Sequence, residues 1–395
     1  MKKLSDIAPP KTPKPTPEKP VKPVHPNGRR QAGVKREGWF KKHRLMLIIA
    51  GIVVIVAAAA LLLPSYLLSS NDQPLSQTDK PAKVAEPVRY YSPLTGLETT
   101  KDKTTAPVMA VMIENSTEAR PQSGLKEAGV VFEAIAEGGI TRFNALFQEA
   151  DADLIGPVRS ARPYYLEWAA AFDPAFVHVG GSQQALQMLG TGRYGLNIDE
   201  VKPTIWRVKN RAAPHNAYTS TAELRKYLEA HGKTTSSFTA WERQDAKKYS
   251  CTCPEDAACD CAAQVKHISI NISSSAYNVV YDWDEATNTY NRSVGGRAHF
   301  SRSADGTDTQ IAPNVVIAIM VNQTLAADHE HNQITTSGNG KAYVFQNGDK
   351  VEGTWSKASP TEQIKFFDAA GTELKLNRGQ VWITAVPVGK GVTWQ

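Results

Sequence analysis

The longest unbroken apolar run in the chain extends from Leu45 to Leu63 and contains no charged residue. As an α-helix at about 1.5 Å per residue, these 19 residues would span about 28 Å, close to the thickness of a bilayer's hydrocarbon core. Basic residues occupy 41–44, directly before the run, whereas 64–88 holds two lysines against three acidic residues. The positive-inside rule therefore predicts a single-pass transmembrane helix, with a cytoplasmic N-terminus and with residues 64–395 outside the cell.

A cleaved signal peptide is the alternative for this run, but its basic region is short and its apolar region covers only about 7–15 residues. Here 44 residues precede the run, and no cysteine near its end could accept a lipid, so we predict an uncleaved signal anchor. Residues 1–44 contain eight prolines and are predicted to be a disordered cytoplasmic tail. A docking site for a proline-binding domain or for anionic lipid is the alternative for this tail. Residues 64–90 are predicted to form a stalk.

Residues 91–240 alternate between apolar runs of strand length and patterns of helical period. Predicted strands cover 107–113, 129–135, 141–148, 154–158 and 175–179. Predicted helices cover 163–172, 182–190 and 221–230, with Ser182 as an N-cap, Gly190 as a helix end, and Ser220 or Thr221 opening the last helix. This mixture predicts a mixed α/β domain.

Residues 266–395 are patterned mainly as strands separated by turn residues. The predicted strands cover 267–272, 279–283, 315–321, 342–346, 350–356, 364–368, 373–376 and 381–386. We therefore predict a β-rich, mostly antiparallel second domain, so that the extracytoplasmic part has an α+β fold. Its aromatic residues, Trp283, Tyr343, Phe345, Trp355 and Trp382, could form a core or line a carbohydrate platform, and their alternating strand positions favour the core.

All four cysteines lie in a predicted linker, residues 241–265, in the segment CTCPEDAACDC. They are Cys251, Cys253, Cys259 and Cys261. Disulfides persist outside the cytoplasm, and the symmetric spacing suits pairing of the outer two and of the inner two, although three pairings are possible. A tetrathiolate metal site is the alternative, but its usual spacing is C-x2-C rather than the C-x-C found here.

The formal net charge of the chain is +6, but the positive surplus is confined to the tail. Residues 1–44 contain 13 Lys or Arg and three Asp or Glu, which leaves 32 basic and 36 acidic residues in the rest of the chain. Nucleic-acid binding needs a basic face to neutralise phosphates, so the main body is not predicted to bind nucleic acid.

Polar residues cluster at the ends of the predicted strands in the first domain. The candidate ligand-binding residues are Arg120, Glu133, Glu137, Arg142, Arg159, Arg162, His178, Gly180, Gly181, Ser182, His215 and Asn216. A strand followed by Gly-Gly, Ser and a helix presents free N–H groups and the positive end of a helix dipole to an anion. Arginine guanidinium groups bind phosphate or carboxylate through two parallel hydrogen bonds.

Each of these residues also has a structural interpretation. Arg159 and Arg162 could pair with Glu133 and Glu137, His178 could be a core histidine, and the Gly-Gly pair could be a tight turn. No nucleophile elbow, Walker loop or H-E-x-x-H pattern is present, and residues 329–331 (HEH) are typical of a loop. We therefore predict no metal and no cofactor, and we assign no catalytic residue.

Several short motifs in a fixed order carry a family resemblance. They are PLTG (93–96), ARPQSGL (119–125), AEGGITRF (136–143), GPVRSAR (156–162), HVGGS (178–182), APHN (213–216), NVV (314–316), GKAYVFQNG (340–348), VEGTW (351–355) and GQVWI (379–383). Together they resemble the YerB-like bacterial lipoprotein family, catalogued as domain of unknown function 3048, across both its N- and C-terminal domains. The resemblance implies a bacterial, envelope-facing protein with two domains and no established activity. This sequence departs from the family in its predicted helical anchor, its basic tail and its cysteine insert.

Two functions follow from these observations. The first is a membrane-anchored binding protein of the cell envelope that holds an anionic ligand or wall polymer at the arginine and Gly-Gly residues, with the lipid bilayer, wall polymer and envelope proteins as partners. The alternative is an envelope enzyme acting on phosphorylated or lipid-linked glycans. In that enzyme the arginines would stabilise developing charge, while Glu133, Glu137 or His178 would move protons.

Overall fold

The computed structural model describes residues 88–247 and 264–395, which belong to one compact unit that begins at Glu86. The predicted cytoplasmic tail, the transmembrane helix at 45–63, the stalk up to residue 87 and all four cysteines lie outside the described residues, and these assignments stay predictions. Within the described part of the chain, no helix is both long enough and apolar enough to cross a membrane.

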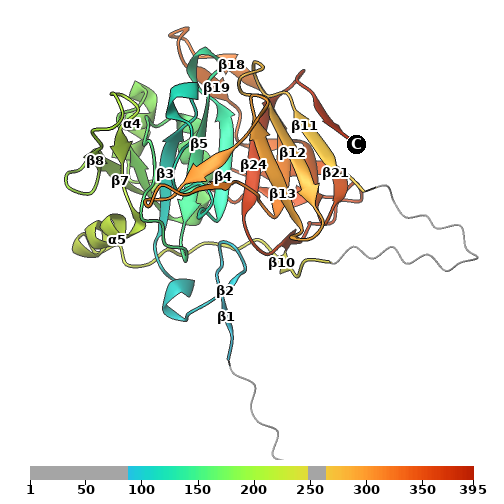
Figure 1. The fold of residues 1–395 in the computed structure, drawn as a ribbon, viewed down its shortest axis with the longest axis horizontal. Helices are drawn as coiled ribbons and strands as arrows, with labels where there is room; N and C mark the ends of the chain where they lie inside the picture. The colour runs from blue at the N-terminus through green and yellow to red at the C-terminus, as the bar shows by residue number, and fades with distance from the viewer. Residues whose placement is uncertain (1–87, 248–263) are drawn as a thin grey trace, which may run out of the picture. The chain divides into compact units, whose positions relative to one another are not determined.

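A ten-stranded mixed sheet forms the centre of the described structure (Figure 1). The earlier part of the chain contributes β3 (Val108–Glu114), β4 (Val130–Ile135), β5 (Thr141–Phe147), β6 (Pro174–His178) and β7 (Leu196–Asp199). The later part contributes β17 (Val315–Val321), β20 (Gly338–Gln346), β21 (Asp349–Lys357), β22 (Lys365–Phe367) and β24 (Val381–Pro387). The strand order is β22-β21-β20-β17-β24-β4-β5-β3-β6-β7, so the sheet runs without a break through both parts.

The two parts meet where β24 pairs in parallel with β4, with Val381 opposite Val130 and Thr384 opposite Glu133. On its other side β24 pairs in parallel with β17, so this last strand of the sheet lies in the interior of the sheet rather than at an edge. The domain boundaries predicted from sequence, 91–240 and 266–395, stay predictions, and a single sheet crosses them.

Two layers cover the central sheet and explain why its inner strands are apolar on both faces. Every residue of β3 is buried; Val108, Ala110 and Met112 pack in one core with Tyr164 and Trp168, whereas the alternate residues face a second core. The first core is covered by α3 (Pro163–Ala169) and α4 (Gln183–Gly190).

The second core is covered by α5 (Thr221–Ala230) and by a five-stranded antiparallel sheet (Figure 1). That sheet has the order β14-β13-β12-β11-β25 and comprises β11 (His267–Ile270), β12 (Val279–Asp284), β13 (Thr289–Val294), β14 (Arg297–Ala298) and β25 (Val392–Trp394). Its contribution to the core consists mainly of Ile268, Ile270, Val279, Tyr281 and Tyr290.

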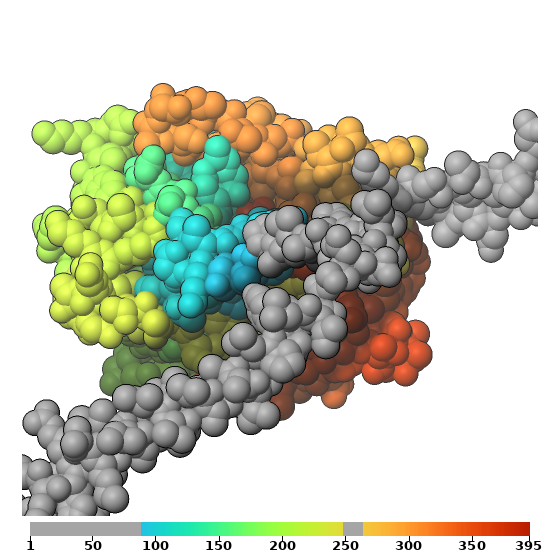
Figure 2. All heavy atoms as spheres, turned by 90° about the horizontal axis from the view of Figure 1, so that it is seen from below, coloured from blue at the N-terminus to red at the C-terminus, as the bar shows by residue number. Residues whose placement is uncertain are grey.

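The N-terminal end of the described chain lies on the surface of this body. A short hairpin of β1 (Tyr90–Tyr91) and β2 (Glu98–Thr99) precedes the sheet strands, and the amide of Gly379 donates to the carbonyl of Thr95 in the hairpin turn. Figure 2 shows this cyan segment on the face of the molecule, between the yellow residues around α5 and the red C-terminal residues. The hairpin thus contacts the C-terminal part of the chain directly.

The expected mixed fold is confirmed at the level of a strand-rich structure with few helices and with antiparallel sheets among the described residues. The three predicted helices are present, and the hydroxyl groups of Ser182 and Ser220 cap α4 and α5. The strand predicted at 154–158 is wrong, since that segment makes only isolated bridges. The core interpretation is confirmed for Phe345, Trp355 and Trp382, which are buried.

Candidate functional site

Polar side chains gather at one edge of the central sheet. Because β3, β4, β6 and β24 run in the same direction, their C-terminal ends lie at this edge, and the antiparallel β5 begins there. In open sheets of this kind, ligands commonly bind beyond the carboxyl ends of parallel strands. The edge carries Glu114 at the end of β3, Arg142 at the start of β5 and His178 at the end of β6.

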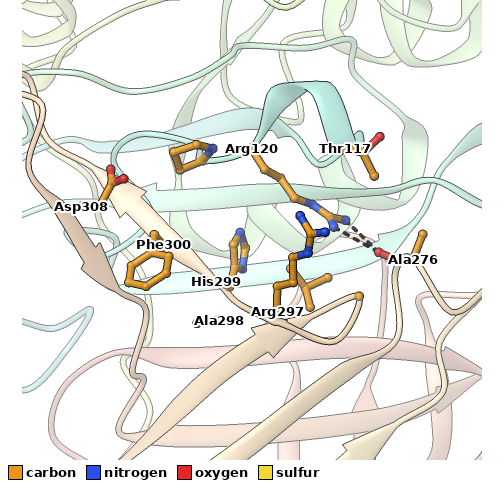
Figure 3. Close-up of a pocket in the computed structure, with 11 residues that line it drawn as sticks. Thr117, Arg120, Ala276, Arg297, Ala298, His299, Phe300 and Asp308 are labelled. Atoms are coloured by element: carbon orange, nitrogen blue, oxygen red, sulfur yellow. Dashed lines mark hydrogen bonds between the residues drawn. The ribbon is translucent and has the colours of Figure 1, made fainter.

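A cavity of about 510 Å³ opens between the polar edge and the hairpin that joins β13 to β14 (Figure 3). Its lining includes Thr117, Arg120, Arg297, His299 and Phe300. In Figure 3 the side chains of Arg120 and Arg297 point toward the same part of the cavity, while Phe300 and Asp308 stand at the other end. The cavity therefore presents two cations and one exposed aromatic ring.

The guanidinium group of Arg120 is held in place by neutral acceptors. Its Nε donates to Asn115 Oδ1 at 3.0 Å, its Nη2 donates to the Asn115 carbonyl at 3.1 Å, and both Nη atoms donate to the Ala276 carbonyl at 3.1 Å. The Tyr277 ring lies below it at 5.2 Å. Burial, and next the positive charge of Arg292, lower the pKa of Arg120 from its ordinary value, and Tyr277, Glu133 and Glu118 act in the opposite direction without outweighing them. Among the residues that the structure describes, no carboxylate contacts this half-buried cation.

Arg297 is exposed and forms no ion pair with any residue in 88–247 or 264–395. The acidic residue in the lining, Asp308, is already neutralised, because Arg302 donates to both of its carboxylate oxygens at 2.7 Å. The cavity thus keeps two positive charges, and no carboxylate among the residues that the structure describes contacts either of them.

Behind the cavity lies a fully buried ion pair between Glu133 and Arg292. Arg292 Nη2 donates to Glu133 Oε2 at 2.8 Å, and Trp382 Nε1 donates to the same oxygen at 3.0 Å. The Arg292 guanidinium also lies 4.5 Å from the centre of the Trp382 ring. Since these three residues come from β4, β13 and β24, the pair ties the five-stranded sheet to the centre of the ten-stranded sheet.

His299 links this buried pair to the wall of the cavity. Its Nε2 lies 2.8 Å from Gln122 Oε1, while its Nδ1 faces Arg292 Nη1. Arg292 can only donate, so Nδ1 accepts and Nε2 carries the proton of a neutral ring. Burial, followed by the charges of Arg292 and Arg120, holds the pKa of His299 well below its usual value.

A second arginine cluster surrounds Glu137, in the turn η3 (Glu137–Gly139) between β4 and β5. Arg142 Nη2 donates to Glu137 Oε2 at 2.8 Å, and Arg162 Nε donates to Glu137 Oε1. His331 Nε2 lies 4.0 Å from Oε1. Burial acts to raise the pKa of Glu137, but the hydrogen bond from Arg162 and the two guanidinium charges outweigh it and lower the pKa.

A third cluster surrounds Glu114, which was not among the residues predicted from sequence. Arg159 Nη2 donates to Glu114 Oε1 at 2.8 Å, the Ser116 hydroxyl donates to the same oxygen at 2.8 Å, and His215 Nδ1 lies 2.9 Å from Oε2. The proposed structural pairings are therefore half right. Arg162 does pair with Glu137, whereas Arg159 pairs with Glu114 and Glu133 pairs with Arg292.

The Gly-Gly segment is satisfied by the chain itself. The Gly180 amide donates to Asp199 Oδ1 at 2.8 Å, so a carboxylate already occupies one of the amides expected to bind an anion. His178 is fully buried, with Nδ1 2.7 Å from the Gly180 carbonyl and Nε2 2.7 Å from Asn197 Oδ1, as expected of a core histidine. Gly181 forms a bridge with Ala161, and Ser182 caps α4.

Asn216 turns away from these clusters, since its Oδ1 accepts from Arg207 Nη1 at 2.9 Å. The structure thus divides the predicted residues among several clusters at one sheet edge rather than gathering them in one cavity. Of the predicted residues, Arg120 alone contributes to the lining of the cavity described above.

Arg292, Arg297 and His299 were not predicted as site residues, because the hairpin that carries them was not predicted from sequence. The segment TYNRSV (289–294) alternates between partly exposed and buried positions, and Gly295 and Gly296 follow it with positive φ angles. That alternation, followed by two glycines, is a strand-and-turn pattern that could have located the hairpin.

Comparison with protein families identifies the class of this protein. Residues 94–234 match the family described as "Protein of unknown function (DUF3048) N-terminal domain", and residues 268–383 match "Protein of unknown function (DUF3048) C-terminal domain". The chain therefore belongs to the DUF3048 family, as the motif resemblance predicted.

Two comparisons concern a particular relative from Bacillus subtilis. The chain is 31% identical to "Putative lipoprotein YerB" of strain 168 over 308 residues, which cover 76% of this chain and 87% of the relative. It is also similar to the crystal structure of the YerB protein from Bacillus subtilis, with a TM-score of 0.66 and 28% identity over 77% of this chain and 99% of that one. The fold described above is thus shared with a solved member of the family.

Proposed function

We propose that this chain is an extracytoplasmic, membrane-anchored binding protein of the bacterial cell envelope, and that its cavity holds an anionic ligand such as a wall polymer. The observation that carries the proposal is the pair of cations, Arg120 and Arg297, which face one cavity without a described carboxylate partner. The apolar run at 45–63 and the lipoprotein name of the relative both support a location at the membrane.

The two arginines would act on the ligand in different ways. A guanidinium group has five N–H donors, and Arg120 already makes four hydrogen bonds to protein acceptors. Arg120 therefore provides a fixed positive charge, and its side chain does not have to be ordered when the ligand binds. Arg297 is exposed and can direct its fork of donors to a phosphate or carboxylate.

Binding is favoured over catalysis by the state of the titratable groups in the lining. A general base needs a free acceptor, but His299 Nδ1 already accepts from Arg292 and its Nε2 donates to Gln122. Asp308 is engaged by Arg302 through both oxygens. The described lining thus offers positive charge and an aromatic surface, provided by Phe300, but no unengaged acid or base.

The proposal is tested by titrating the full-length chain in detergent with soluble poly(glycerol phosphate), using calorimetry. We expect binding that is weakened at least tenfold by Arg297→Glu and left unchanged by Arg193→Glu, which reverses the charge of an exposed arginine outside the cavity lining. Neutral dextran provides the uncharged control. Equal affinities for the wild type and the Arg297→Glu variant would overturn the proposal.

A further inference from the structure

The Glu137 cluster has the composition of an anion site that already contains an anion. Two guanidinium groups converge on one carboxylate, and each of its oxygens accepts from a different arginine. The side chains of Arg142 and Arg162 are 14% and 6% exposed, whereas that of Glu137 is 27% exposed. The cations therefore lie at the bottom of the cluster, and the carboxylate covers them from the solvent side.

Both arginines are fixed by contacts that do not involve Glu137. Arg142 lies in β5, where its Nη1 donates to the Ser160 carbonyl at 3.3 Å. The Tyr165 hydroxyl donates to the backbone carbonyl of Arg142 at 2.7 Å. Arg162 directly precedes α3, and its Nη1 donates to the Ala161 carbonyl at 2.6 Å. Each guanidinium group therefore keeps one hydrogen bond to a backbone carbonyl when the carboxylate is removed.

Glu137, by contrast, stands on the part of the cluster best able to move. It opens a three-residue turn whose other members, Gly138 and Gly139, have φ angles of 60° and 74°. No atom outside the adjoining residues lies within 4 Å of the position that a Gly138 Cβ would take, so space lies beside Gly138, while the Ser273 hydroxyl donates to the Gly139 carbonyl at 2.6 Å and holds the other side of the turn. A second cavity, of about 470 Å³, borders Gly138, Gly139, Asn332 and Lys390.

We propose that Arg142 and Arg162 form a second binding site, for a phosphate group, and that Glu137 occupies this site as an internal substitute until a phosphate displaces it. Arg142, Arg162 and Glu137 together carry one net positive charge. A doubly charged phosphate would neutralise both arginines and would offer them more acceptor oxygens than the carboxylate does. Motion of the glycine turn toward the neighbouring cavity would accommodate the displaced carboxylate. This site is separate from the cavity at Arg120 and Arg297, and it accounts for the convergence of the AEGGITRF and GPVRSAR motifs.

Phosphate-dependent thermal stability of the full-length chain tests this proposal. Glu137→Gln removes the competing charge and keeps the volume of the side chain. We expect 10 mM inorganic phosphate to raise the Tm of this variant by several degrees, at a half-saturating concentration at least tenfold below that of the wild type. Sodium chloride of equal ionic strength should not reproduce the shift.

Three variants separate this effect from general charge effects. Glu352→Gln removes an exposed carboxylate that pairs with Lys341 and Lys350, and it should respond to phosphate as the wild type does. Adding Arg162→Met to Glu137→Gln should abolish the phosphate shift, whereas adding Arg193→Glu, at an exposed arginine outside both cavities, should leave it intact. If Glu137→Gln folds but gains no phosphate response beyond that of Glu352→Gln, Glu137 is only a structural partner of the arginines and the proposal is wrong. If Glu137→Gln does not fold, Glu137→Asp, which withdraws the carboxylate by one methylene, should show the same gain, and its absence would equally overturn the proposal.

Discussion

The cavity at Arg120 and Arg297 and the cluster at Glu137 lie along the same sheet edge, yet they treat their arginines in opposite ways. In the cavity, neutral carbonyl groups hold Arg120, and no described carboxylate contacts either cation. In the cluster, one carboxylate contacts both Arg142 and Arg162. The comparison shows that residue type alone does not mark a binding site, since the local balance of charge decides whether a cation is available to a ligand.

The largest expected effect concerns the buried pair behind the cavity. Arg292→Met would leave Glu133 charged and without its partner in a fully buried position, a change that costs about 3–5 kcal/mol in proteins. Urea unfolding of the full-length chain measures this loss. Arg302→Met breaks the exposed pair with Asp308 and should cost less than about 1 kcal/mol. Similar losses for both variants would show that the buried pair has no special structural role.

The next effect separates the two arginines of the cavity. Arg120→Met leaves the carbonyls of Asn115 and Ala276 without a donor, so the free energy of unfolding should fall by about 1–3 kcal/mol. Arg297→Met removes an exposed side chain and should change stability by less than about 0.5 kcal/mol, while still weakening poly(glycerol phosphate) binding. Chemical denaturation and calorimetry of both variants test whether Arg120 has a structural role and Arg297 is free to bind a ligand. A lower stability for Arg297→Met than for Arg120→Met would contradict this assignment.

The smallest effect is a pH dependence that originates at His299. Its pKa is lowered in the folded state, so the unfolded chain binds more protons and stability falls as the pH drops below about 6.5. The slope for one such group is at most about 1.4 kcal/mol per pH unit, down to the folded pKa. In His299→Gln, the unfolding free energy measured between pH 7 and pH 5 should depend less on pH than in the wild type. Parallel curves for the two proteins would contradict the prediction.

The central strands were predictable from sequence because burial on both faces leaves mostly apolar runs, as in β3 and in β4, where Glu133 is the one interruption. Helices α4 and α5 were predictable from their serine caps. The β13–β14 hairpin was missed because a buried arginine, Arg292, occupies a position where a core strand normally carries an apolar residue.

The candidate site was less predictable than the fold, because its contacts join distant parts of the chain. Arg292 and Glu133 are 159 residues apart, and Arg159 and Glu114 are 45 apart. No local pattern states which of several carboxylates an arginine will meet. The partnership of Arg162 with Glu137 was one of the pairings considered, whereas the role of Glu114 became apparent only once β3 and the 156–162 segment were placed side by side.

The interior position of β24 also bears on how the protein is made. Until residues 381–387 have been synthesised, β4 and β17 each lack one of their two neighbours, and both expose backbone hydrogen-bonding groups at an unfinished edge. The sheet is therefore completed late in folding, and chains truncated before this strand should be substrates for chaperones and proteases.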